Sequence, residues 1–136
     1  MTNGFAVVAV PQPIIPAPPV ILRAAPKKAA SGEISEILVA KPPRFAPTVA
    51  SYEVYRTRDP IRAASGDFRK LSLVKVVQVT QASWIGPSDA QYSMIEDDSV
   101  SQNHEYFYMV VARARGPPSA AGTRSRASAG LAISLS

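Results

Sequence analysis

Aromatic and β-branched residues alternate with other residues in two segments of this chain. Tyr52 and Val54 stand two positions apart in the first segment, and Tyr or Val recurs at every second position at the start of the second, Tyr106–Ala112. Side chains two positions apart on a β-strand point to the same face of the sheet. Both segments therefore predict strands, with Tyr52 and Val54 on the core face of the first strand and Tyr106, Tyr108, Val110 and Ala112 on the core face of the second.

Other short apolar segments, separated by turn residues, predict the remaining strands. Prolines at Pro42-Pro43, Asp59-Pro60 and Gly86-Pro87 mark breaks, because proline cannot donate a hydrogen bond to a sheet ladder. Seven or eight short strands separated by turns indicate an all-β sandwich. The expected strands are 20–22, 34–40, 51–57, one or two within 68–79, 91–95, 106–112 and one within 128–135.

Residues 11–19 hold five prolines in nine positions. Such a segment favours the extended polyproline II conformation and cannot enter a sheet interior. We therefore expect a Pro-rich N-terminal arm over residues 1–19 and one β-sandwich over residues 20–136. The arm is interpreted either as a passive spacer or as a segment that docks on a neighbouring subunit.

The composition excludes several classes of site. The chain has no cysteine, so disulfides, thiolate catalysis and cysteine-ligated zinc are not available. No apolar run approaches the length of a membrane span, and Phe5–Val10 lacks the basic leader of a signal peptide. The formal net charge of +5 favours acidic partners only in a general way.

The order and spacing of several short motifs resemble the fibronectin type III family, in its bacterial and phage versions. Tyr52-Glu53-Val54-Tyr55-Arg56-Thr57 is similar to the third strand of that family, and Asp98-Ser99-Val100 followed by Tyr106–Ala112 is similar to the sixth. Gly116 with Ser119 resembles the turn before the last strand. The resemblance covers about residues 16–136.

This resemblance implies an immunoglobulin-like β-sandwich of about seven strands. Tyr106 would be the corner tyrosine, whose hydroxyl donates a hydrogen bond to a backbone acceptor. The family's core tryptophan on the second strand is replaced here by Val39 or Ala40. Trp84 therefore either fills the same core from another strand or lies exposed.

Candidate catalytic groups are sparse. His104, the single histidine, stands in a polar turn without a recognisable nucleophile or orienting acid. The acidic run Glu96-Asp97-Asp98 lacks the alternating spacing and glycine of a calcium loop, which favours a solvated turn-capping role. We expect no enzyme activity, no cofactor and no metal site.

Two sets of residues are candidates for contact with a partner. Arg113 and Arg115, and Arg124 and Arg126, are paired at a spacing of two on either side of a predicted hairpin, which suits an anion or an acidic protein. No nucleic-acid motif accompanies them. Arg115-Gly116-Pro117 stands where the cell-adhesion tripeptide Arg-Gly-Asp of the family would lie, so integrin-type binding is not expected. The second set is in the arm: Pro11, Ile14, Ile15 and Pro16.

The sequence therefore predicts a non-catalytic structural or protein-interaction module. Its expected partners are the protein subunits of a larger assembly, most concretely a bacteriophage or phage-like virion (capsid or tail), or an extracellular or cell-surface assembly. The alternative is a spacer or carbohydrate-binding accessory domain of a secreted bacterial polysaccharide-degrading enzyme. The glycan alternative predicts that Trp84 and Tyr55 are exposed on one flat face.

Overall fold

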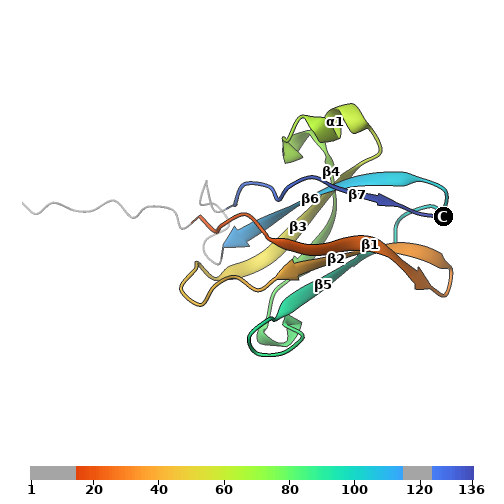
Figure 1. Cartoon of the computed structure of the whole chain (residues 1–136). Coiled ribbons are helices and arrows are strands. Elements are labelled where there is room, and N and C mark those ends of the chain that lie inside the picture. The colour runs from red at the N-terminus through yellow and green to blue at the C-terminus, as the bar shows by residue number, and fades with distance from the viewer. Residues whose placement is uncertain (1–14, 115–123) are drawn as a thin grey trace, which may run out of the picture.

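The structure, a computed structural model, describes residues 15–114 and 124–136. Two antiparallel sheets pack face to face (Figure 1), which confirms the predicted all-β architecture. One sheet has the strand order β1-β2-β5 and the other the order β4-β3-β6-β7. The bounds are β1 Ile21–Ala29, β2 Gly32–Ala40, β3 Val49–Thr57, β4 Ser72–Gln78, β5 Tyr92–Asp97, β6 Glu105–Ala114 and β7 Leu131–Ser134. Short helices are α1 Pro60–Ala64, η1 Phe68–Lys70 and η2 Gln81–Ser83.

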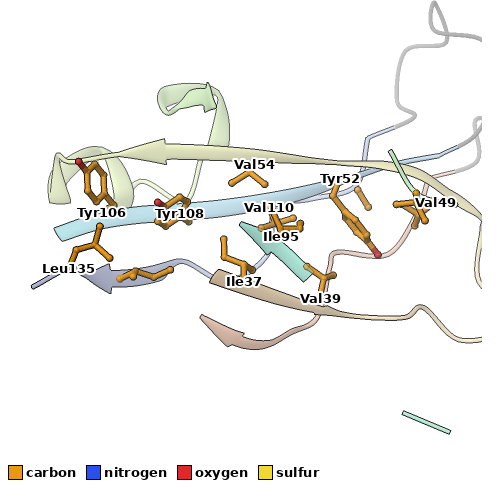
Figure 2. Packing of buried hydrophobic residues seen from close by; sticks show 13 residues of the cluster. Ile37, Val39, Val49, Tyr52, Val54, Ile95, Tyr106, Tyr108, Val110 and Leu135 are labelled. Carbon is orange, nitrogen blue, oxygen red and sulfur yellow. The ribbon is translucent and has the colours of Figure 1, made fainter. Parts of the chain in front are cut away.

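The hydrophobic core fills the space between the two sheets (Figure 2). Tyr52 and Val54 of β3 face it, as predicted, together with alternate residues of β6. The opposing sheet contributes Ile37, Val39 and Ile95. Burying an apolar side chain of this size stabilises a fold by roughly 1.5–3 kcal/mol. The buried members of the core are Ile37, Val39, Val49, Tyr52, Val54, Val79, Ile95, Tyr106, Tyr108, Val110, Ala112, Ile133 and Leu135.

The first strand is longer than predicted. Its expected range was 20–22, but β1 runs from Ile21 to Ala29 and includes Pro26 opposite Ser35. β1 lies at the edge of its sheet, where a strand has one neighbour only, so a missing N–H can be tolerated. The full strand was not predicted because Pro26 and the two lysines after it interrupt the apolar pattern of a strand.

Two predicted extended or turn segments contain helices. Asp59-Pro60 begins α1: Asp59 caps the helix, its Oδ1 accepting a hydrogen bond from Ile61 N over 2.9 Å, and Pro60 takes the first turn. Asp67 caps η1 in the same way through Arg69 N, at 3.0 Å. The strand expected within 68–79 therefore begins only at Ser72.

Two serines that precede β7, Ser125 and Ser128, continue the pairing along β6 through their hydroxyls. Ser125 N–H donates to the Ala112 carbonyl over 2.8 Å, and Ala112 N–H donates to Ser125 Oγ over 2.9 Å. Ser128 repeats this exchange with Val110, at 2.8 and 3.0 Å. The two serines are three residues apart but face positions two apart on β6, so hydroxyls replace the carbonyls of a regular ladder. The predicted last strand, within 128–135, is confirmed at Leu131–Ser134.

Candidate functional site

A groove of about 790 Å³ lies at the end of the sandwich where β1 begins and β2 ends. We call it the end groove. Its charged rim carries Lys41 and Arg44 on one segment and Asp89 on another. Pockets of about 300–1,000 Å³ are typical of binding sites. The apolar part of its lining consists of Leu22, Ala40, Pro42, Pro43, Ala46, Pro47, Val49, Val79, Trp84 and Ala90.

Trp84 reaches the core from the connection between β4 and β5, directly after η2. Its half-buried ring packs edge-on against Tyr52, with ring centroids 6.4 Å apart, and Lys41 Nζ lies 5.9 Å from the indole centroid. The expectation of a core tryptophan is therefore met in part. Trp84 packs against the core and also lines the end groove, and it stands on no strand.

Exposed apolar side chains gather at the same end. Ala40 N–H donates to the Val20 carbonyl, and Lys41 N–H donates to Gln91, so the start of β1, the end of β2 and the start of β5 lie together. Phe45, in the loop between β2 and β3, is 95% exposed. Exposed apolar patches on a folded domain are typical of interaction surfaces. Four of the nine large hydrophobic side chains that are exposed among the described residues line the groove or adjoin its lining residues: Val20, Leu22, Phe45 and Ile85.

The described part of the arm repeats its burial every three residues. Pro16 is buried and Pro19 half-buried, whereas Ile15, Ala17 and Pro18 are exposed. A period of three fits the three residues per turn of polyproline II. Of the four predicted contact residues in the arm, Ile15 is thus available to a partner and Pro16 is not; Pro11 and Ile14 lie outside the described residues.

The structure brings two of the four predicted arginines together. Arg113 and Arg124 face each other in an isolated bridge, Arg126 is exposed, and Arg115 lies outside the described residues. Arg124 is engaged: its Nε donates to Glu53 Oε1 over 2.8 Å, and this hydrogen bond raises the pKa of the guanidinium. Glu53, which sequence reasoning missed, thus neutralises one member of the set.

A buried polar network joins the two sheets around Asp97. Asp97 Oδ2 accepts from Arg56 Nη1 and from the Tyr108 hydroxyl, both over 2.8 Å. Asp97 Oδ1 accepts from Ser99 N, at 3.1 Å, and from Ser99 Oγ, at 2.7 Å. With 3% of its surface exposed, Asp97 is not the solvated residue that the acidic run suggested, although it caps the turn as expected.

The electrostatics of this network are those of a structural site. Burial acts to raise the pKa of Asp97, but the hydrogen bonds from Ser99, Tyr108 and Arg56 outweigh it and hold that pKa below its ordinary value. Burial also raises the pKa of the Tyr108 hydroxyl. Asp97 therefore stays ionised and Tyr108 neutral near neutral pH, and the four hydrogen bonds that Asp97 accepts all come from protein donors.

The other candidate groups, His104 and Glu96, have different partners and do not form one site. His104 Nδ1 lies 3.0 Å from Arg58 Nη2, and its ring stands edge-on to Tyr106. Glu96, next to Asp97, instead forms an ion pair with Lys27 at 3.1 Å. Within residues 15–114 and 124–136, no three acidic or histidine side chains are grouped closely enough to hold a metal ion.

The two aromatic rings of the glycan alternative are not exposed on one flat face, so that prediction is wrong. Tyr55 is half-buried and packs on Phe68, with ring centroids 4.8 Å apart, and its hydroxyl donates to Glu53. Trp84 is half-buried against Tyr52, on the core side of β3. A flat stacking platform made by these two rings is therefore absent.

In comparisons with known proteins, neither a family model nor a curated protein matches the chain. Among the described residues, the helices are too short and too polar to cross a bilayer.

Proposed function

We propose that the chain is a non-catalytic structural or protein-interaction module of a larger assembly, and that the end groove is its contact surface. One observation carries this proposal: exposed Leu22 lines the end groove, and exposed Phe45 and Ile85 stand next to lining residues in the chain. Exposing these side chains to water is unfavourable unless a partner covers them. The proposal needs no chemistry beyond apolar contact.

The polar groups support a binding role rather than a catalytic one. The Asp97 carboxylate is enclosed by Arg56, Tyr108 and Ser99, and a carboxylate in that state cannot reach a substrate. Among the described residues, the His104 ring forms a hydrogen bond with Arg58 and with no hydroxyl or carboxylate group, which a catalytic base would need. In this proposal, the groups whose pKa values are shifted therefore stabilise the fold and take no part in catalysis.

The finer fold assignment that we propose is the fibronectin type III type. Strand order supports it: β4 pairs with β3, whereas in the constant-type immunoglobulin arrangement the fourth strand lies beside the fifth. Tyr106 also supports it, because its buried hydroxyl accepts a hydrogen bond from Ser101 N over 2.9 Å, five residues upstream. That is the place and the contact of a corner tyrosine.

The assembly that we propose is a bacteriophage or phage-like virion, with the chain in its capsid or tail. This rests on the resemblance to phage versions of the fold and on the apolar end groove. The alternative, a spacer in a secreted polysaccharide-degrading enzyme, requires no such surface. A spacer would tolerate a charge in the groove, whereas a subunit contact would not.

Co-sedimentation with the particle from the producing organism tests the proposal. Leu22→Asp places a charge in the end groove at a side chain that is 56% exposed, so the fold should be unaffected. Leu73→Asp is the matched control, because Leu73 is 50% exposed on β4, outside the groove. We expect the first variant to be lost from the particle fraction and the second retained. Equal retention of both variants would contradict the proposal.

A further inference from the structure

The N-terminal segment is unusually free of charge. Residues 1–22 contain no aspartate, glutamate, lysine or arginine, and the first ionisable side chain is that of Arg23. Phe5–Val10 is a continuous apolar run within it. A segment of this composition exposes apolar surface at a cost in free energy unless it is covered.

The C-terminal end of this segment lies at the rim of the end groove. The carbonyl of Val20 accepts a hydrogen bond from Ala40 N over 2.9 Å, and both Ala40 and Leu22 line the groove. Ile15–Val20 then continues without a turn, and Pro16, Pro18 and Pro19 restrict its backbone to extended conformations. At roughly 3.1 Å per residue, five such steps displace residue 15 by about 15 Å from Val20.

The described part of the arm, Ile15–Val20, contains no reversal that would lead it back toward its own groove. The groove of a second copy requires no such reversal. Because the arm and the end groove lie at the same end of the sandwich, a two-fold axis at that end would let two copies exchange arms reciprocally.

We propose that the end groove binds the N-terminal segment, residues 1–14, of a second copy of this chain. The inference rests on the proposed function, since it names the partner for the same groove. The chemistry is that of an apolar segment with two prolines on an apolar lining: in this proposal Pro11 and Pro13 meet Trp84, Leu22 and the prolines of the groove. An extended proline-rich segment loses little conformational entropy when it binds.

The groove and the segment also match in charge. Lys41 Nζ on the rim is already held by Gln91 Oε1 at 3.1 Å and by the face of Trp84. An uncharged segment leaves these contacts intact, whereas an acidic peptide would compete for the lysine. At Lys41, the groove therefore suits an uncharged occupant.

Sedimentation velocity of three forms of the protein tests the exchange. We expect the full chain to form a dimer, and both the chain lacking residues 1–14 and Leu22→Asp to be monomers. Leu73→Asp should remain a dimer. A mixture of the truncated chain with Leu22→Asp should form a heterodimer, because one partner supplies an intact groove and the other an intact arm. A monomeric full chain, or a dimer that survives truncation, would overturn the proposal.

The single tryptophan provides a direct readout of the groove. A synthetic peptide of residues 1–14 contains neither tryptophan nor tyrosine, so emission excited at the red edge of tryptophan absorption comes from Trp84 alone. Titrating this peptide into the truncated chain should shift that emission saturably, and the shift should be lost in the truncated Leu22→Asp protein. If the peptide has no effect while Leu22→Asp still fails to join the particle, the groove binds a different subunit: the proposed function stands and arm exchange is refuted.

Discussion

The hydroxyl of Tyr108 lies 2.8 Å from Asp97 Oδ2 and thereby joins the middle of β6 to the end of β5 in the opposite sheet. The same oxygen is 2.8 Å from Ser35 Oγ on β2. An ionised carboxylate can only accept, so the single proton of Tyr108 is directed to Asp97 and the Ser35 hydroxyl donates to Tyr108. Together with Arg56, this network specifies how the two sheets face each other.

Replacing Asp97 by Asn should destabilise the fold strongly. The variant removes the charge that compensates Arg56, whose side chain is only 20% exposed. Removing one partner of a buried ion pair costs about 3–5 kcal/mol, and the residual exposure of Arg56 places our expectation near the lower value. Urea unfolding measures the change. Glu96→Gln, at the neighbouring residue with its exposed Lys27 partner, is the control and should change the midpoint little.

The pH dependence of the unfolding free energy should also report the contribution of Asp97. The pKa of Asp97 is depressed in the folded state, so the stability it supplies is fully present above the unfolded value of about 3.9. That contribution is lost as the pH falls from there through the depressed folded pKa. Urea midpoints between about pH 5 and pH 2.5 should therefore fall less steeply in Asp97→Asn than in the wild type. Parallel pH profiles would argue that Asp97 has an ordinary pKa.

Tyr106→Phe should cost about 1 kcal/mol or more. The resemblance led us to expect that the tyrosine hydroxyl donates to a backbone acceptor, but it accepts from Ser101 N–H instead. The variant therefore leaves a partly buried backbone donor without its partner. Chemical denaturation gives the change in unfolding free energy, and an unchanged midpoint would refute the role of Tyr106.

Tyr52→Phe is the matched control for Tyr106→Phe. Both tyrosines are buried, but no described residue forms a hydrogen bond with the Tyr52 hydroxyl. Burial raises the pKa of Tyr52 to about 12, so this hydroxyl is neutral under all the conditions of the experiment. Its removal should change the free energy of unfolding far less.

The central strands were predictable because their pattern is local. Tyr52 and Val54 on β3, and the alternation on β6, need only a period of two to identify the core face. β1 was mostly missed because Pro26 is acceptable only at a sheet edge, and a single sequence does not reveal which strand is an edge. Helix α1 was missed because Asp59-Pro60 suits both a turn and a helix start.

The candidate site was harder to predict because its residues are distant in sequence. Leu22, Pro42 and Trp84 meet only when β1, β2 and η2 are assembled, and no spacing in the sequence signals that meeting. Asp97 was interpreted as solvated because it stands in an acidic run. Its burial depends on Arg56, 41 residues away in the chain. Surplus apolar residues near Val20 were the one available signal of a contact surface.

Ser128→Ala should destabilise the last strand through a lost hydroxyl. Val110 N–H is buried in the middle of β6 and donates to Ser128 Oγ over 3.0 Å, where a regular ladder would supply a carbonyl. The alanine variant leaves that donor unpaired, which should cost about 1–3 kcal/mol. Hydrogen exchange should locate the loss, because the Val110 amide should exchange faster in the variant.

Ser134→Ala distinguishes this effect from a general sensitivity of the C-terminal segment. Ser134 is exposed on β7, and its hydroxyl donates to Glu105 Oε2 over 3.0 Å at the surface, so water can replace the hydroxyl there. We expect its unfolding free energy to stay near that of the wild type and its Val110 amide to remain protected. Similar losses in the two serine variants would show that the hydroxyl of Ser128 does not substitute for a ladder carbonyl.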